Sequence, residues 1–194
     1  MRAPWKFLRD DRGSVAVEMA IVGPPFILLM LTIVEMALTL VTQSLLDGAT
    51  RDAAGLIRTG QIASAGNVND QVALFQRALC NNLGTLLSQA TCNSNVVFEV
   101  EPYSSFGGMT FQHDPPCTHN ATSGGSGVAC PFNLGSAGQI VGVEVRYWRP
   151  FIVPWIGGCL SGGGCWAGDG TAPGSNPRTV MQTSVVVFRY QPSR

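Results

Sequence analysis

The sequence predicts a mixed α+β protein: a single N-terminal transmembrane helix that continues into an amphipathic stalk, then a helix and an antiparallel sheet in a disulfide-bearing domain. Three observations support this prediction: a long apolar run near the N-terminus, a later change from helical to strand periodicity, and six cysteines that all follow the run. With 194 residues, the chain suits one compact domain plus an appendage. Helices followed by strands favour α+β over a doubly wound parallel sheet.

The apolar run predicts a membrane span. Residues 14–46 contain no basic side chain, and their only acids are Glu18 and Glu35. About 20 helical residues cross a hydrocarbon core roughly 30 Å thick. A removable secretory signal is the rival interpretation, but its apolar part has about 7 to 15 residues and ends in a small-x-small site. Pro24 and Pro25 predict a bend near residues 21–25.

Charge on the two sides of the span predicts its orientation. Four basic residues precede it, whereas the two that follow it are accompanied by Asp47 and Asp52. The denser basic cluster stays in the cytoplasm, so residues 47–194 are expected in the periplasm. An even number of cysteines on that side agrees with an oxidising compartment, although reduced buried thiols are the alternative. The cysteines are Cys80, Cys92, Cys117, Cys130, Cys159 and Cys165.

Periodicity predicts the elements after the span. Residues 47–60 continue the helix as an amphipathic stalk with one apolar stripe. A second helix, capped by Asn69 or Asn67, is expected to run to about Leu87. Strand-like patterns then follow in three segments, which predict an antiparallel sheet: 96–100, 140–148 and 180–190.

The disulfide pattern remains open. Short pairings would anchor the glycine-rich connections: Cys80 with Cys92, Cys117 with Cys130, and Cys159 with Cys165. Six cysteines nevertheless allow about 15 connectivities, and the sequence does not choose among them.

A glycine stands at the boundary between basic and apolar residues, and a glutamate lies five residues beyond it. These residues, Gly13 and Glu18, resemble the prepilin-peptidase site of type IV pilin-like proteins, which are cut after the glycine. Continued to Pro24, the segment resembles the TadE/TadF-like minor pilins, or pseudopilins, of the Tad (tight adherence) system. Glu35 also fits that family, and the resemblance covers about residues 9–60.

The resemblance implies a function. Residues 1–13 would be a basic leader that a prepilin peptidase removes between Gly13 and Ser14. The mature chain would be a minor subunit or assembly factor of a Tad/Flp-type pilus, acting in pilus biogenesis and surface adherence. Its partners would be other pilin or pseudopilin subunits, the inner-membrane assembly platform and the membrane itself. Met19 and the large exported domain depart from the major Flp-type pilins, so a minor subunit fits better.

The two glutamates of the span have separate interpretations. A carboxylate at the bilayer centre costs about 2.5 to 3.5 kcal/mol, so Glu18 is expected to pair with the amine of Ser14 or with that of a neighbouring subunit. A snorkelling acid without a role is the alternative. At about 100° per residue, Glu35 points to a face roughly 100° away, so it needs a different partner or lies hydrated near the periplasmic interface.

Other function classes are disfavoured. Twelve basic and twelve acidic residues give no net field for nucleic acid. His113, Cys117 and His119 form an irregular set without a second cluster, so no metal is expected. Nucleophile-elbow, P-loop and zinc-helix motifs are missing, so neither an enzyme nor a cofactor is expected. The alternative is a signal-anchored periplasmic enzyme or a disulfide-stabilised binding protein unrelated to pili.

Overall fold

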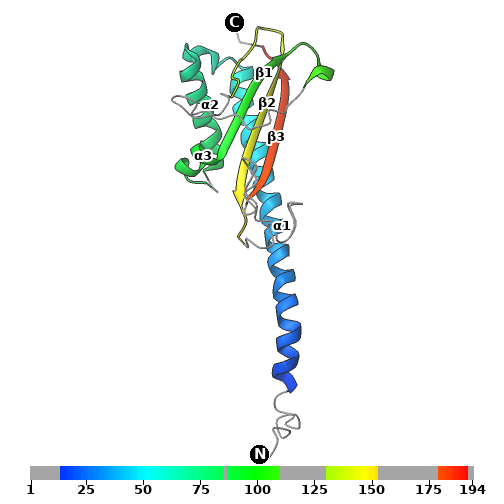
Figure 1. The fold of residues 1–194 in the computed structure, drawn as a ribbon. Helices are drawn as coiled ribbons and strands as arrows, with labels where there is room; N and C mark the ends of the chain where they lie inside the picture. Colours follow the sequence, from blue (N-terminus) through cyan, green and yellow to red (C-terminus); the bar gives the residue numbers. More distant parts are fainter. Residues whose placement is uncertain (1–13, 85–86, 110–129, 153–178, 192–194) are drawn as a thin grey trace, which may run out of the picture. The chain divides into compact units, whose positions relative to one another are not determined.

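The structure is a computed structural model that describes residues 14–84, 87–109, 130–152 and 179–191 (Figure 1). The chain divides into an N-terminal unit, Met1–Leu38, and a C-terminal unit, Thr39–Arg194. The predicted α+β class is confirmed. Its elements in chain order are α1 (Ser14–Arg58), α2 (Val68–Leu83), α3 (Gln89–Asn95), β1 (Val96–Tyr103), β2 (Ile140–Pro150) and β3 (Thr179–Arg189).

Helix α1 has 45 residues and contains both the apolar run and the stalk. It continues through Pro24 and Pro25 without interruption, although each proline removes one backbone donor from the helical ladder. The prediction that the apolar helix continues into the stalk is therefore confirmed.

The C-terminus of α1 is closed by a Schellman motif. Gly60 has a φ of 78°, in the left-handed region that glycine adopts without steric cost. The Gly60 N–H donates to Ile57 O at 2.9 Å, and the Gln61 N–H donates to Leu56 O at 3.0 Å. This pair of hydrogen bonds satisfies carbonyls that the helix end would otherwise leave without donors.

The three strands form one antiparallel sheet in the order β1-β2-β3 (Figure 1). Phe98 pairs with Val145 across β1 and β2, and Val143 pairs with Val186 across β2 and β3. Since side chains alternate between the faces of a sheet, these residues all lie on one face.

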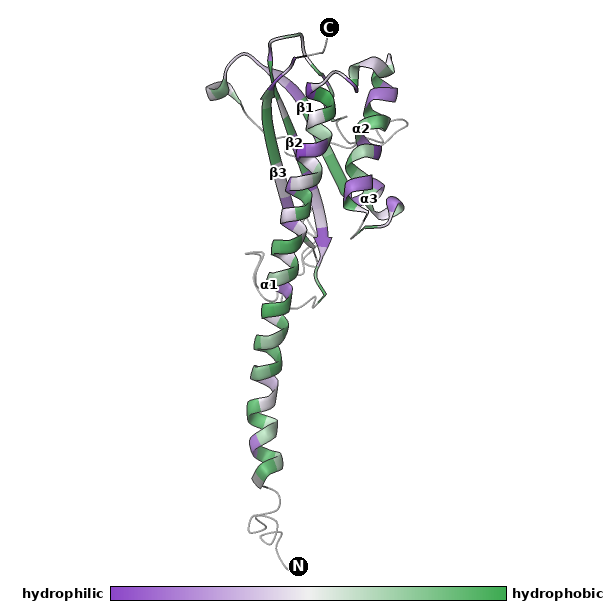
Figure 2. Ribbon diagram, turned by 180° about the vertical axis from the view of Figure 1, so that it is seen from behind, coloured by the Kyte–Doolittle hydropathy of each residue, from purple (hydrophilic) through white to green (hydrophobic). Residues whose placement is uncertain are grey.

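That face carries the hydrophobic core of the C-terminal unit. Figure 2, seen from behind, shows the C-terminal part of α1 and helix α2 over the sheet. Phe75 of α2 and Phe98 of β1 pack with ring centroids 4.8 Å apart. The fully buried core side chains include Leu46, Ala53, Ile57, Ile62, Phe75, Leu79, Val100, Val141, Val143 and Val145.

The helices after α1 differ from the sequence prediction in their bounds. Asn67, not Asn69, caps α2, because its Oδ1 accepts the Asp70 N–H at 2.9 Å. Helix α2 ends at Leu83, before Gly84, rather than at Leu87. The short helix α3 was not predicted.

Candidate membrane-anchoring and assembly segment

The N-terminal part of α1 exposes large apolar side chains. Val15 is 73% exposed and Met19 is 71% exposed, and exposed apolar residues continue to Val41. Figure 2 shows hydrophobic residues through most turns of this part of the helix. Soluble monomers rarely expose contiguous apolar patches larger than a few hundred Å². This surface therefore requires lipid or other apolar helices around it.

Helix α1 is long enough and apolar enough to cross a membrane, and it alone meets these criteria among the described residues. One polar side chain within the run is accommodated locally. The Thr32 hydroxyl donates to Leu28 O at 2.8 Å, which supplies its hydrogen bond inside the helix itself. Such internal pairing is what a helix surrounded by hydrocarbon needs.

Glu18 lies on the exposed surface in the first turns of α1. It stands one helical turn after Ser14, the first residue of α1, so the two share a face. Helical side chains tilt toward the N-terminus, which directs the Glu18 carboxylate toward the start of the helix. Gly13 and the rest of the expected leader lie outside the described residues.

Glu35 is in a different environment. It is only 2% exposed, whereas Glu18 is exposed. A hydrated Glu35 near the interface was one of two interpretations of the sequence. In the structure this side chain is buried. The two glutamates therefore do not form one site.

A polar junction marks the beginning of the C-terminal unit and consists of Thr39, Gln43, Arg149, Gln182 and Thr183. Arg149 Nη2 donates to Thr39 Oγ1 at 2.9 Å, and Gln182 Nε2 donates to Thr39 O at 2.8 Å. Gln43 Nε2 donates to Thr183 O at 3.0 Å. These hydrogen bonds fix α1 to the end of β2 and the start of β3.

The opposite face of the sheet holds a buried ionic network. Arg146 donates from Nε and Nη2 to both carboxylate oxygens of Glu144 at 2.9 Å, and its Nη2 lies 3.2 Å from Glu99 Oε1. Glu99 and Glu144 are directly paired across β1 and β2, so one guanidinium contacts and offsets two like charges. Each of the three residues is nearly buried.

Tyr103 lies on the same face as this network. Its hydroxyl donates to Glu101 Oε2 at 3.2 Å. Burial, followed by the charge of Glu101 and this hydrogen bond, raises the pKa of the Tyr103 hydroxyl to about 12. Tyr103 therefore stays neutral at physiological pH.

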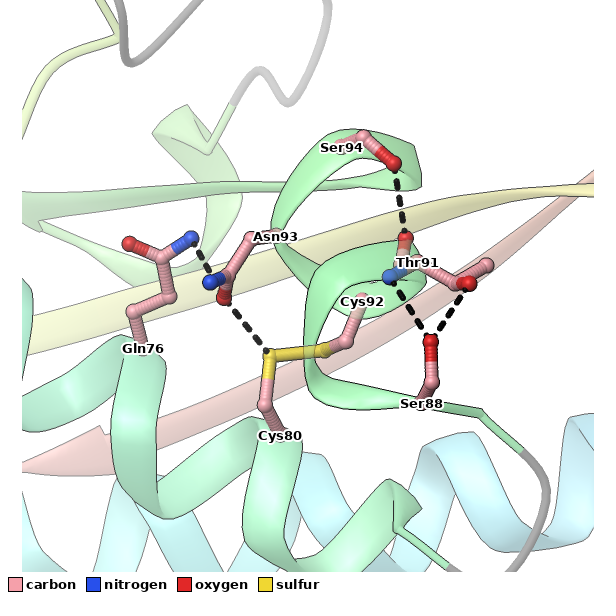
Figure 3. The surroundings of a disulfide bond; sticks show 7 residues. All are labelled: Gln76, Cys80, Ser88, Thr91, Cys92, Asn93 and Ser94. Carbon is pink, nitrogen blue, oxygen red and sulfur yellow. Dashed lines mark hydrogen bonds between the residues drawn. A yellow bond between two sulfur atoms is a disulfide. The ribbon is translucent and has the colours of Figure 1, made fainter.

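A disulfide joins Cys80 of α2 to Cys92 of α3 (Figure 3). Nearby, Gln76 Nε2 donates to Asn93 Oδ1 at 3.2 Å. The same Oδ1 lies 3.6 Å from Cys80 Sγ, which is a contact rather than a hydrogen bond because a disulfide sulfur has no proton. The Thr91 N–H donates to Ser88 Oγ and so caps α3 (Figure 3).

Cys130 is disulfide-bonded as well, so every cysteine among the described residues is oxidised. The other candidate site residues lie outside the described part of the chain: Cys117, Cys159, Cys165, His113 and His119. Among the described residues, no group of three or more His, Cys, Asp or Glu side chains is arranged to hold a metal ion.

Sequence reasoning missed the polar junction and the ionic network. Arg149 follows an apolar strand, and Thr39 is one of several threonines in an apolar helix. Arg149 and Thr39 are 110 residues apart, so no pattern within a short stretch of sequence could pair them. The alternation of Glu99, Glu144 and Arg146 with valines marked strands, but alternation would normally place charged residues on a solvated face.

Comparison with known proteins adds one finding. Residues 13–55 match the family model described as TadE-like protein. The match covers most of α1 and confirms the resemblance drawn from Gly13, Glu18 and Pro24. No curated protein and no solved structure matches the chain.

Proposed function

We propose that this chain is a minor pilin-like subunit or assembly factor of a Tad/Flp-type pilus, acting in pilus biogenesis and surface adherence. The TadE-like match supports a Tad pilus-related protein. One observation supports the more specific role in a pilus. The matched residues contain the exposed apolar surface of α1, which requires lipid or partner helices, and they also contain the exposed carboxylate of Glu18.

The proposal assigns the parts of the chain to a membrane topology. Residues 14–46 span the bacterial inner membrane, with the basic residues 1–13 in the cytoplasm and residues 47–194 in the periplasm. The basic N-terminal cluster favours this orientation. The oxidised cysteines of the C-terminal unit also favour it, since disulfides persist in oxidising compartments.

Processing would expose the partner that Glu18 needs. A prepilin peptidase cutting after Gly13 would remove the leader and leave a free amine on Ser14. The tilt of helical side chains directs Glu18 toward that amine, one turn away. In an assembly, the same carboxylate would pair with the amine of a neighbouring pilin or pseudopilin subunit, on the inner-membrane assembly platform.

N-terminal sequencing of the membrane-extracted protein tests this proposal. A mature chain that starts at Ser14 is expected. Gly13→Trp should leave the precursor inserted but uncut, because the indole would collide in a cleft that accepts a residue without a side chain. Gly23→Trp is the matched control, since a Cβ at Gly23 meets nothing within 4 Å and this glycine lies beyond the cleavage site.

Two results would contradict the proposal. Normal leader removal in Gly13→Trp would eliminate the cleavage site. A mature start within residues 45–70 would show an ordinary secretory signal and an exported protein without this anchor.

A further inference from the structure

One end of the sheet lies where α1 enters the C-terminal unit. At this entry end, Pro150 pairs with Thr179, and Trp148 pairs with Met181. Thr39, the first residue of the C-terminal unit, accepts hydrogen bonds from Arg149 and Gln182, and Gln43 donates to Thr183 O. Residues 39–43 of α1 therefore lie at the same level as residues 181–183 of β3.

The proposed membrane span ends close to this level. Within the proposed span of residues 14–46, about 20 helical residues cross the hydrocarbon core itself, so a crossing that begins at Glu18 ends near residue 37 and the later residues lie at the headgroups. Thr39 follows within two residues, and each helical residue advances only about 1.5 Å. Chain continuity therefore brings Thr39, and the sheet residues that are hydrogen-bonded to it, close to the end of this crossing. This step rests on the proposed function, since it requires α1 to be a membrane anchor.

Exposed apolar side chains gather at the same level. On α1, Leu40 is 73% exposed and Val41 is 50% exposed. At the entry end of the sheet, Ile152 is 64% exposed and Met181 is 56% exposed. Trp148, paired with Met181, is half-buried. Exposed aliphatic side chains beside an indole are typical of protein surfaces at the headgroup boundary of a bilayer.

We infer that the entry end of the sheet, through Ile152 and Met181, contacts the phospholipids of the membrane that α1 crosses. This contact gives the C-terminal unit a second attachment to the bilayer beside its helix. Ile152 and Met181 bury apolar surface among the acyl chains and headgroups, which water would otherwise solvate at a free-energy cost. The partner is lipid, because the apolar segment of α1 that crosses the proposed membrane ends beside this end of the sheet.

Strand β3 supplies a matched control. Val185 is also apolar and 45% exposed, and it lies on the same face of the same strand as Met181. It is four residues farther from the entry end, a rise of about 13 Å along the strand. Lipid contact should therefore occur at Met181 and not at Val185.

The test places the photoreactive residue benzoylphenylalanine singly at Met181, Ile152, Val185 or Phe26 in the full-length protein. Each variant is reconstituted in bilayers of phosphatidylethanolamine and phosphatidylglycerol, and lipid adducts are measured by mass spectrometry after illumination. Phe26 lies on the exposed apolar surface of α1 and reports anchoring by itself. A cooperative thermal transition matching that of the unsubstituted protein confirms that each variant is folded.

Lipid adducts are expected at Phe26, Met181 and Ile152. None is expected at Val185. Adducts at Phe26 with none at Met181 or Ile152 would overturn the lipid contact while leaving the anchor intact. Equal labelling at Met181 and Val185, or crosslinks from Met181 to protein instead of lipid, would also overturn it. No adduct at Phe26 would defeat the membrane anchor itself, and the inference with it.

Discussion

Arg149 and Thr39 are joined by a hydrogen bond of 2.9 Å, from Nη2 to Oγ1, although they lie 110 residues apart in the chain. The Thr39 carbonyl also accepts Gln182 Nε2 at 2.8 Å. Thr39 of α1 is thus bonded to β2 through its own hydroxyl and to β3 through its own main-chain carbonyl. Arg149 is almost fully buried, and its guanidinium lies 5.7 Å from the centre of the Phe151 ring.

Removal of the Thr39 hydroxyl should destabilise the C-terminal unit. Thr39→Val keeps the branched shape but takes an acceptor from a buried charged donor, at a cost of about 1–3 kcal/mol. Thermal unfolding of the detergent-solubilised protein, followed by far-ultraviolet circular dichroism, measures the loss. Thr59→Val is the control, because the Thr59 hydroxyl is exposed and donates to Gly55 O and Leu56 O within its own helical turn. Equal stabilities of the two variants would contradict the role of the junction.

Arg146 should be essential to the stability of the sheet. Arg146→Met leaves the paired carboxylates of Glu99 and Glu144 buried without their common cation, which costs about 3–5 kcal/mol. Adding Glu144→Gln to this variant should recover part of the loss, because one of the two charges is removed. Arg77→Met, an exposed substitution on α2, should change stability by no more than about 0.5 kcal/mol. If the double variant, Arg146→Met with Glu144→Gln, is no more stable than Arg146→Met alone, the electrostatic explanation is contradicted.

Tyr103 should make stability fall at high pH. Burial, followed by Glu101, raises its pKa to about 12 in the folded protein, above an unfolded value of about 10. The folded state therefore holds the phenolic proton more tightly. The stabilisation is complete below pH 10 and is lost as pH rises from about 10 to about 12.

Phenolate absorbance as a function of pH measures this titration directly. Glu101→Gln should lower the Tyr103 pKa by removing the charge, while the contribution of burial remains. Tyr103→Phe should remove the highest-pH part of the absorbance change. An unchanged titration in Glu101→Gln would show that Glu101 has no influence on this hydroxyl.

Glu18→Gln should separate assembly from membrane insertion. Glutamine keeps a similar size and hydrogen-bonding capacity but removes the charge that would attract the amine of Ser14 or of a neighbouring subunit. The expected result is a stable, inserted and cleaved protein with fewer pili, counted by electron microscopy. Asp52→Asn is the matched control, because it also removes an exposed acid from α1 but outside the proposed span. Unchanged pilus number with Glu18→Gln would leave Glu18 as a tolerated acid without a role.

The sequence alone determined the local elements. The apolar run and the stalk stripe predicted α1, and Asn67 was one of two predicted caps for α2. All three strands were found where alternation predicted them, although β1 continues to Tyr103. These features depend on residues close together in the chain, so periodicity and capping chemistry reveal them. The motif around Gly13 and Glu18 could be recognised for the same reason, because its residues are close together in the chain.

Only the tertiary structure decided which distant residues meet. It chose the pairing of Cys80 with Cys92, buried Glu35 and brought Arg149 to Thr39. It also placed Arg146 between two glutamates in the interior, where alternation alone suggests a solvated face. The energy of such contacts depends on burial and on the register between strands. Neither quantity exists until the chain has folded, and no spacing in the sequence encodes it locally.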